Sequence, residues 1–183
     1  YTDEDRAAAY ARACRFLGDF ETGLAFLRRR EQTLGDRSGA PAQTLFDELD
    51  VQERVPEAFA VLAQAQRRRP GDAALGAFAA QAHLRYGQLD AAGAALQRIE
   101  GGAVQQATLL KVRSLVFEAR HDFAAALSAA QRASELEPLN LDHRRLVARQ
   151  LERQQGREAA LRSLEAAAAA LRRAWPARPG SRP

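Results

Sequence analysis

Few residues of the chain could perform catalysis or hold a metal. Its three histidines are His83, His121 and His143, and none has a metal-ligand spacing such as H-x-x-x-H with a carboxylate in phase. Cys14 is the single cysteine, which excludes an intramolecular disulfide and a multi-cysteine metal site. We expect Cys14 to be a buried, inert thiol. We expect His143, at the start of a helix, to be exposed.

Motifs for phosphate binding and acid–base chemistry are also missing from the sequence. The pair Gly101-Gly102 lacks the Lys-Ser or Lys-Thr that follows in a phosphate-binding loop. Carboxylates are plentiful, but on helix surfaces we expect them to be solvated; examples are Glu48, Asp50, Asp90 and Glu118. The sequence therefore predicts no enzyme, no catalytic residue, no metal and no cofactor.

Composition indicates that helices position these side chains. The chain has 183 residues, which suits one domain. Hydrophobic residues make up 46% of it, much of that alanine, and aromatic residues only 7%. Alanine favours helices over strands, and no segment alternates as a strand would. The predicted fold class is therefore all-α.

Targeting signals are equally sparse. No apolar run approaches the roughly 20 residues of a membrane span. The chain begins at Tyr1, without methionine and without a signal-peptide pattern. We expect a processed protein or an excised piece of a longer one. The sequence does not identify the compartment, although a cytoplasmic location is favoured over a periplasmic one.

The net charge of +4 comes almost entirely from arginine, since Lys111 is the only lysine. A basic chain can bind nucleic acid, but its arginines are scattered among acidic residues, and arginine with abundant alanine is typical of a GC-rich bacterial genome. The runs 28–30 and 67–69 are both predicted at helix ends, where cations face the negative end of the helix dipole. We therefore expect no nucleic-acid partner. That alternative would require a steep salt dependence of binding.

A regular repeat runs through the chain. Ala58, Ala92 and Ala126 are evenly spaced, and their period of about 34 residues is that of the tetratricopeptide repeat. Pro70 and Pro138 are separated by two such periods. The segment from His121 to Asn140 contains an Asp-Phe pair, then alanines, then Pro-x-Asn, and it resembles the second-helix pattern of that family. A plain helical bundle is the alternative.

The resemblance implies a right-handed superhelical α-solenoid of about five antiparallel hairpins, as in a bacterial tetratricopeptide protein or domain. The solenoid would cover 1–175, with repeats at about 4–37, 39–72, 73–106, 107–140 and 141–174, and 176–183 as a disordered tail. Glu53 and His121 would replace the turn glycine, and His83 an aromatic residue that packs. Alanines would allow close helix crossings. The space between repeats would be filled by Leu96, Phe117, Phe123 and Leu127.

In this family the first helices line a concave groove that binds peptides. The matching positions predict a groove made of Arg12, Arg15, Gln81, Arg85, Lys111, Arg145 and Arg149; Gln43 and Asp47 share these positions. The asparagines of the family's carboxylate clamp are replaced by Arg12, Asp47, Gln81, Leu115 and Arg149. The basic lining at Lys111, Arg145 and Arg149 favours an acidic peptide instead.

The resemblance therefore predicts a scaffold that binds a partner protein or peptide in its groove. The alternative is the non-catalytic domain of a larger enzyme, such as a sulfotransferase or glycosyltransferase. A homodimer is a further open alternative, because solenoid ends and concave faces often pair.

Overall fold

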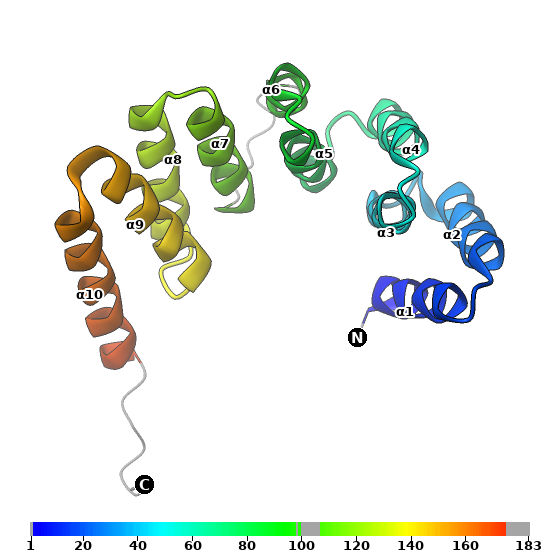
Figure 1. The fold of residues 1–183 in the computed structure, drawn as a ribbon, viewed down its shortest axis with the longest axis horizontal. Coiled ribbons are helices and arrows are strands. Elements are labelled where there is room, and N and C mark those ends of the chain that lie inside the picture. Colours follow the sequence, from blue (N-terminus) through cyan, green and yellow to red (C-terminus); the bar gives the residue numbers. More distant parts are fainter. Residues whose placement is uncertain (1, 98, 100–106, 175–183) are drawn as a thin grey trace, which may run out of the picture. The chain divides into compact units, whose positions relative to one another are not determined.

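The structure is a computed structural model, and it describes residues 2–97, 99 and 107–174. Within these residues, all the regular secondary structure is helical (Figure 1). These residues form ten α-helices and no strand, which confirms the all-α prediction. The helices are α1 (Asp3–Phe16), α2 (Phe20–Leu34), α3 (Ala40–Val51), α4 (Val55–Arg68), α5 (Ala73–Arg85), α6 (Leu89–Gln97), α7 (Ala107–Ala119), α8 (Phe123–Leu136), α9 (Leu141–Gln155) and α10 (Arg157–Ala174). Trp175, the predicted tail and Gly101-Gly102 lie outside the described residues.

Short polar side chains begin several of these helices. The Asp19, Asp122 and Asn140 side chains each accept a hydrogen bond from a main-chain N–H in the first turn of α2, α8 and α9. These bonds satisfy amides that have no partner within the helix. Pro70 and Pro138 follow the ends of α4 and α8, where proline prevents the helix from continuing.

Left-handed residues in the turn within each hairpin mark the repeat. Gly18, Glu53, Gly87 and His121 have φ values of 79°, 60°, 68° and 62°. Successive members of this set are one repeat apart, so Glu53 and His121 take the place of the turn glycine, as predicted. Residues with a Cβ are strained at this φ, which gives the family's preference for glycine a direct physical cause.

Replacing Glu53 with glycine should stabilise the protein. Glu53 is exposed and its φ is 60°, so Glu53→Gly removes the strain at the Cβ without losing a buried contact. We expect the free energy of unfolding to rise by about 0.5–1 kcal/mol, measured by urea denaturation. Glu53→Ala is the matched control: it removes the same carboxylate but keeps the Cβ. An equal gain for both variants would mean that the charge, not the backbone, was destabilising.

Small residues lie where the two helices of a hairpin cross. Ala58, Ala92 and Ala126 are fully buried, as predicted from their spacing. Gly23 occupies the same position in the first hairpin, one repeat before Ala58. A Cβ on Gly23 would lie 3.1 Å from the Cβ of Cys14 and 3.3 Å from the main chain of Ala11. The close helix approach therefore depends on small side chains at this position.

The chain divides into two compact units. Unit 1 comprises 1–82 and 94–102, and unit 2 comprises 83–93 and 103–183. In unit 1, α1 packs on α2 and α3, α2 on α3, and α3 on α4; in unit 2, α7 packs on α8, α8 on α9, and α9 on α10. The predicted repeat limits and the single domain over 1–175 stay predictions.

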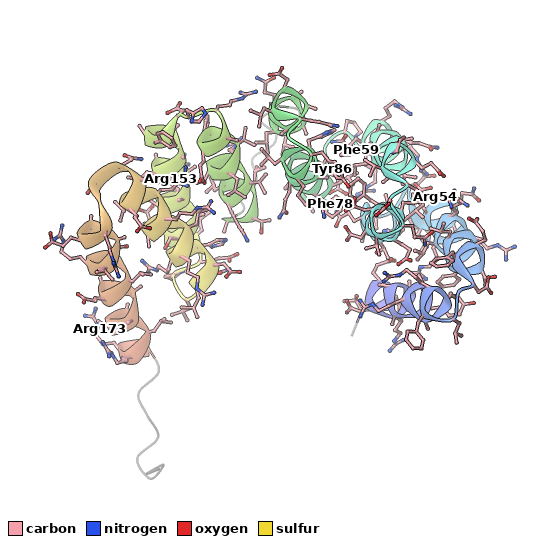
Figure 2. The ribbon with its side chains drawn as sticks, viewed as in Figure 1. Arg54, Phe59, Phe78, Tyr86, Arg153 and Arg173 are labelled. Atoms are coloured by element: carbon pink, nitrogen blue, oxygen red, sulfur yellow. The ribbon has the colours of Figure 1, made fainter. Side chains whose placement is uncertain are left out.

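Each unit has its own hydrophobic core. In unit 1 the fully buried Phe46 ring meets the rings of Phe59 and Phe78 edge to face, at centroid distances of 5.3 and 5.4 Å; Phe59 and Phe78 are labelled in Figure 2. In unit 2, Ala130 of α8 clusters with Leu146 and Val147 of α9, and Leu115, Leu127 and Leu151 pack against this cluster. Among the predicted packing residues, Leu96 is buried, and Phe117, Phe123 and Leu127 are partly buried.

Two expectations about local environment were wrong. His143 is only 2% exposed, because it shares one face of α9 with the buried Leu146, Val147 and Gln150. The arginine run 28–30 lies inside α2, which continues to Leu34, rather than at a helix end. The other run does reach the end of α4, whose last turn contains Arg67 and Arg68.

Candidate functional site

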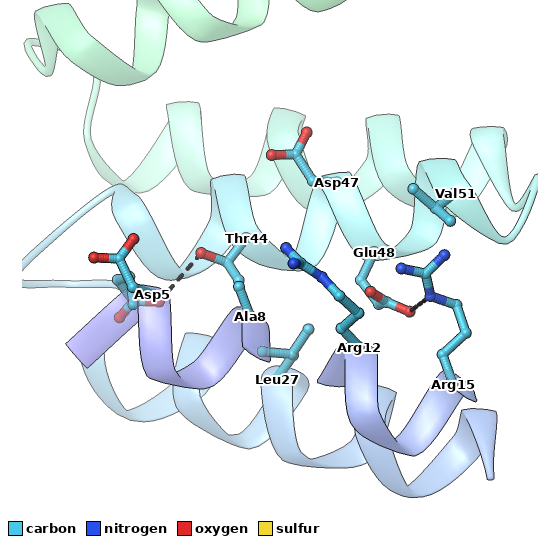
Figure 3. A pocket seen from close by; sticks show the side chains of 10 residues that line it. Asp5, Ala8, Arg12, Arg15, Leu27, Thr44, Asp47, Glu48 and Val51 are labelled. Atoms are coloured by element: carbon cyan, nitrogen blue, oxygen red, sulfur yellow. Dashed lines mark hydrogen bonds and ion pairs between the residues drawn. The ribbon is translucent and has the colours of Figure 1, made fainter. Parts of the chain in front are cut away.

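A pocket of about 310 Å³ opens in unit 1 between the first helices of two successive hairpins (Figure 3). Most of its lining comes from α1 and α3, and Leu27 of α2 contributes to it. The lining residues are Glu4, Asp5, Ala8, Arg12, Arg15, Leu27, Thr44, Asp47, Glu48 and Val51. It therefore contains two predicted groove residues, Arg12 and Arg15, together with Asp47. Neither Gln43 nor Gln81 lines it.

Ion pairs neutralise much of the charge around this pocket. The Arg15 Nε lies 3.1 Å from Glu48 Oε1, and the Arg30 guanidinium lies 2.6 Å from Glu4 Oε1. The Thr44 hydroxyl donates a second hydrogen bond to Glu4. Glu48 is buried, so the prediction that it would be solvated was wrong. Helix α3 directs Glu48 toward α1, where the guanidinium of Arg15 compensates for lost hydration.

Arg12 differs from the other cations of the pocket. Its side chain is exposed, and it forms no ion pair with any residue that the structure describes. In Figure 3 its guanidinium extends into the space between α1 and α3. Arg12 can therefore bind an incoming anion without first giving up a partner in the protein.

The carboxylate of Asp5 keeps the pocket wall negative near the start of α1. Its main hydrogen bond comes from the Thr2 main-chain N–H at 2.7 Å. That bond, with a smaller contribution from the Thr2 side chain, lowers the pKa of Asp5 below its ordinary value. Asp5 is thus ionised at neutral pH, and it would repel a second negative charge in the ligand.

In unit 2 the predicted basic residues do not form an uncompensated lining. Arg145 lies 3.6 Å from Asp142, and Arg149 Nη2 lies 2.6 Å from Glu118 Oε2. Lys111 is partly buried. Arg85 and Gln81 are exposed on α5, Arg85 within unit 2 and Gln81 within unit 1.

Glu118 is a partly buried acceptor rather than a fully solvated carboxylate, which corrects the prediction. Its side chain is 13% exposed, and three side chains of α9 surround it. Besides Arg149, the Gln150 Nε2 donates to it at 2.6 Å, and Arg153 lies at 3.2 Å. Because α7 and α9 are first helices of successive hairpins, these contacts stabilise the face where the predicted groove residues lie.

Interhelical ion pairs elsewhere were also missed from the sequence. Glu31 of α2 is buried and pairs with Arg68 of α4. Arg69 lies 2.9 Å from Asp72, just before α5. The arginines at 67–69 had suggested solvated helix ends. No spacing rule within one helix could have found Glu31 and Arg68, since they are 37 residues apart.

The cysteine and histidines form no catalytic or metal-binding arrangement in the described part of the chain. Cys14 is buried, as predicted. The His83 Nδ1 lies 2.7 Å from Gln88 Oε1. In the ranges that the structure describes, no three His, Cys, Asp or Glu side chains are placed to hold a metal ion. Within the same ranges, no helix is both long and apolar enough to span a membrane.

Known structures with the same fold exist, although no family model matches the sequence and no curated protein is similar to it in sequence. The MamA 41-end structure from Desulfovibrio magneticus RS-1 is 16% identical, with a TM-score of 0.67 over 96% of this chain and 99% of that chain. A crystal structure of MamA protein is 14% identical, with a TM-score of 0.67 over 98% of each chain.

The chain has a tetratricopeptide-like fold. This all-α helical solenoid is the architecture shared with the MamA structures, and it replaces the plain bundle that the sequence left as an alternative. At such low identity the similarity establishes the fold alone.

Proposed function

We propose that this protein is a non-catalytic interaction scaffold that binds a segment of a partner protein on the face formed by its first helices. The observation that carries the proposal is the pocket between α1 and α3, in which Arg12 is exposed and forms no ion pair with a described residue. The resemblance to the tetratricopeptide family, whose members bind peptides on this face, supports the same role.

The pocket combines an anion-binding group with apolar surface. Ala8 and the exposed Val51 can contact an aliphatic side chain of a ligand, while the Arg12 guanidinium can bind a carboxylate with two parallel hydrogen bonds. A segment with one carboxylate next to an apolar residue fits these features. Small numbers of well-placed polar groups in an apolar site are typical of specific binding.

The surrounding carboxylates limit how acidic the ligand can be. Asp5 also lines the pocket, and an array of negative charges would be repelled by its carboxylate. In unit 2, Arg145 and Arg149 already have carboxylates nearby. We therefore narrow the acidic peptide expected from the sequence to a segment with a single acidic group, either a side chain or a C-terminus.

Charge reversal at Arg12 tests this proposal. A random peptide library displayed on phage is selected against the wild-type protein, and the enriched peptides are synthesised. We expect them to contain one acidic group beside an apolar residue. Because Arg12→Glu replaces attraction with repulsion, their Kd should rise at least about tenfold, as measured by isothermal titration calorimetry.

Arg37→Glu is the matched control, since Arg37 is an exposed arginine in the loop between α2 and α3 and does not line the pocket. It changes the net charge equally and should leave the Kd unchanged. Equal weakening by both variants would indicate a general charge effect. If Arg12→Glu has a native circular dichroism spectrum and binds the peptides normally, this pocket is not the binding site.

A further inference from the structure

The last helix exposes leucines at positions that are buried or partly buried in every earlier hairpin. Leu164 of α10 is 39% exposed. The residues at the same position of the four earlier hairpins are at most 5% exposed; they are Ala130, Leu96, Leu62 and Leu27. Leu161 is 47% exposed, whereas its counterpart Leu127 is partly buried and packs against the cluster of Ala130, Leu146 and Val147. The same holds for Ala168, which is exposed where Ser134 is buried.

The first helix also exposes residues at positions that are covered in later hairpins, on the face that would pack against a preceding hairpin. Tyr10 of α1 is 45% exposed, and Ala9 beside it is also exposed. In two later first helices the residue that corresponds to Tyr10 is covered: Leu45 of α3 is 1% exposed, and Val147 of α9 is 8% exposed. Leu45 and Val147 lie on helices that pack against the second helix of the preceding hairpin.

The interface between α8 and α9 shows how these two faces fit together. Ala130 of α8 clusters with Leu146 and Val147 of α9, and Leu127 of α8 packs against this cluster. Leu161 and Leu164 of the last hairpin are the counterparts of Leu127 and Ala130. Ala9 and Tyr10 of the first hairpin are the counterparts of Leu146 and Val147. The two exposed faces thus continue the series of interfaces between successive hairpins.

We propose that copies of this chain associate head to tail, with the α1 face of one copy, at Ala9 and Tyr10, packing on the α10 face of another, at Leu161 and Leu164. The occupant of each exposed face is then a second copy of the same chain, and the contact repeats the geometry of α8 on α9. Support for this association does not rest on ligand binding at the pocket.

Charges at the helix ends favour this arrangement. In the α8–α9 pair the end of the second helix leads directly into the start of the next first helix. In the proposed contact the last turn of α10, with Arg172 and Arg173, therefore lies beside the first turn of α1 in the other copy. That turn contains Asp3, Glu4 and Asp5; Figure 2 labels Arg173 on α10. Opposite charges meet, and each sign also suits the helix dipole at its own end.

A head-to-tail contact uses different surfaces on the two partners. An open assembly of any number of copies therefore keeps one free α1 face at one end and one free α10 face at the other. Such heterologous contacts produce open chains unless they close into a ring. The contact is small, so we expect weak association, with a Kd on the order of 100 µM. Oligomer size should consequently rise with protein concentration rather than stop at a dimer.

Sedimentation velocity with complementary variants tests this arrangement. We expect the weight-average mass of the wild-type protein to increase at least about twofold as its concentration passes through the Kd. Tyr10→Glu and Leu164→Glu should each remain monomeric at every concentration. An equimolar mixture of the two should form a one-to-one dimer and nothing larger, because each variant retains one intact face.

Ala9→Arg and Ala168→Arg provide a second pair that removes no existing contact, in case either first substitution disturbs folding. Leu141→Glu changes a leucine of α9 that is 51% exposed, and it should leave association unchanged. A wild-type protein that stays monomeric overturns the proposal. Self-association of Tyr10→Glu alone would point to a symmetric α10 contact instead and would equally overturn it. If Leu164→Glu lowers the free energy of unfolding but leaves the weight-average mass equal to that of the wild-type protein, another part of the same chain covers the α10 face. That outcome also overturns the proposal.

Discussion

Phe46→Ala should lower the free energy of unfolding by about 3–5 kcal/mol, the range for removing a buried aromatic ring. Phe46 is fully buried and contacts the rings of Phe59 and Phe78, so it joins α3, α4 and α5. The structure around a deleted buried side chain relaxes only partly. The resulting cavity should therefore remain largely open.

Hydrogen exchange followed by mass spectrometry measures this effect locally. A repeat protein can lose one region while keeping another, so we expect faster exchange in unit 1 and little change in unit 2. Phe16→Ala is the matched control, because Phe16 is 90% exposed and should change stability by less than about 0.5 kcal/mol. Equal losses for both variants would show that Phe46 does not join these helices in a core.

Glu118→Ala should destabilise unit 2 by about 2–3 kcal/mol. The substitution leaves the guanidinium groups of Arg149 and Arg153 without the anion that they share. It also removes the acceptor of Gln150 Nε2, a side chain that is completely buried. An unsatisfied buried donor is more destabilising than the net gain from one hydrogen bond suggests.

Urea denaturation followed by circular dichroism measures this loss, and Glu152→Ala is the control. Glu152 is an exposed carboxylate of α9, so its removal should be nearly neutral. Glu118→Gln should fall between the two, because it keeps an acceptor oxygen but loses the charge. A Glu118→Ala protein as stable as the Glu152→Ala protein would mean that Glu118 is solvated after all.

Some of the candidate site followed from repeat spacing, and some did not. The register placed Arg12, Arg15 and Asp47 on first helices, and all three line the pocket. The same register predicted that Arg145 and Arg149 would be free to bind an acidic ligand, although a carboxylate of the protein lies near each. Spacing identifies which face a residue occupies, but not whether a side chain from another hairpin has already neutralised it.

The sequence by itself determined the helices and the repeat. Alanine content, the even spacing of Ala58, Ala92 and Ala126, and the turn positions of Glu53 and His121 are local features, because they depend on backbone propensity and on contacts within one hairpin. The tertiary structure alone decided the environments of Glu31, Glu48 and Glu118. Each pairs with an arginine tens of positions away in the chain, and no periodic pattern specifies which charges will meet when successive hairpins pack.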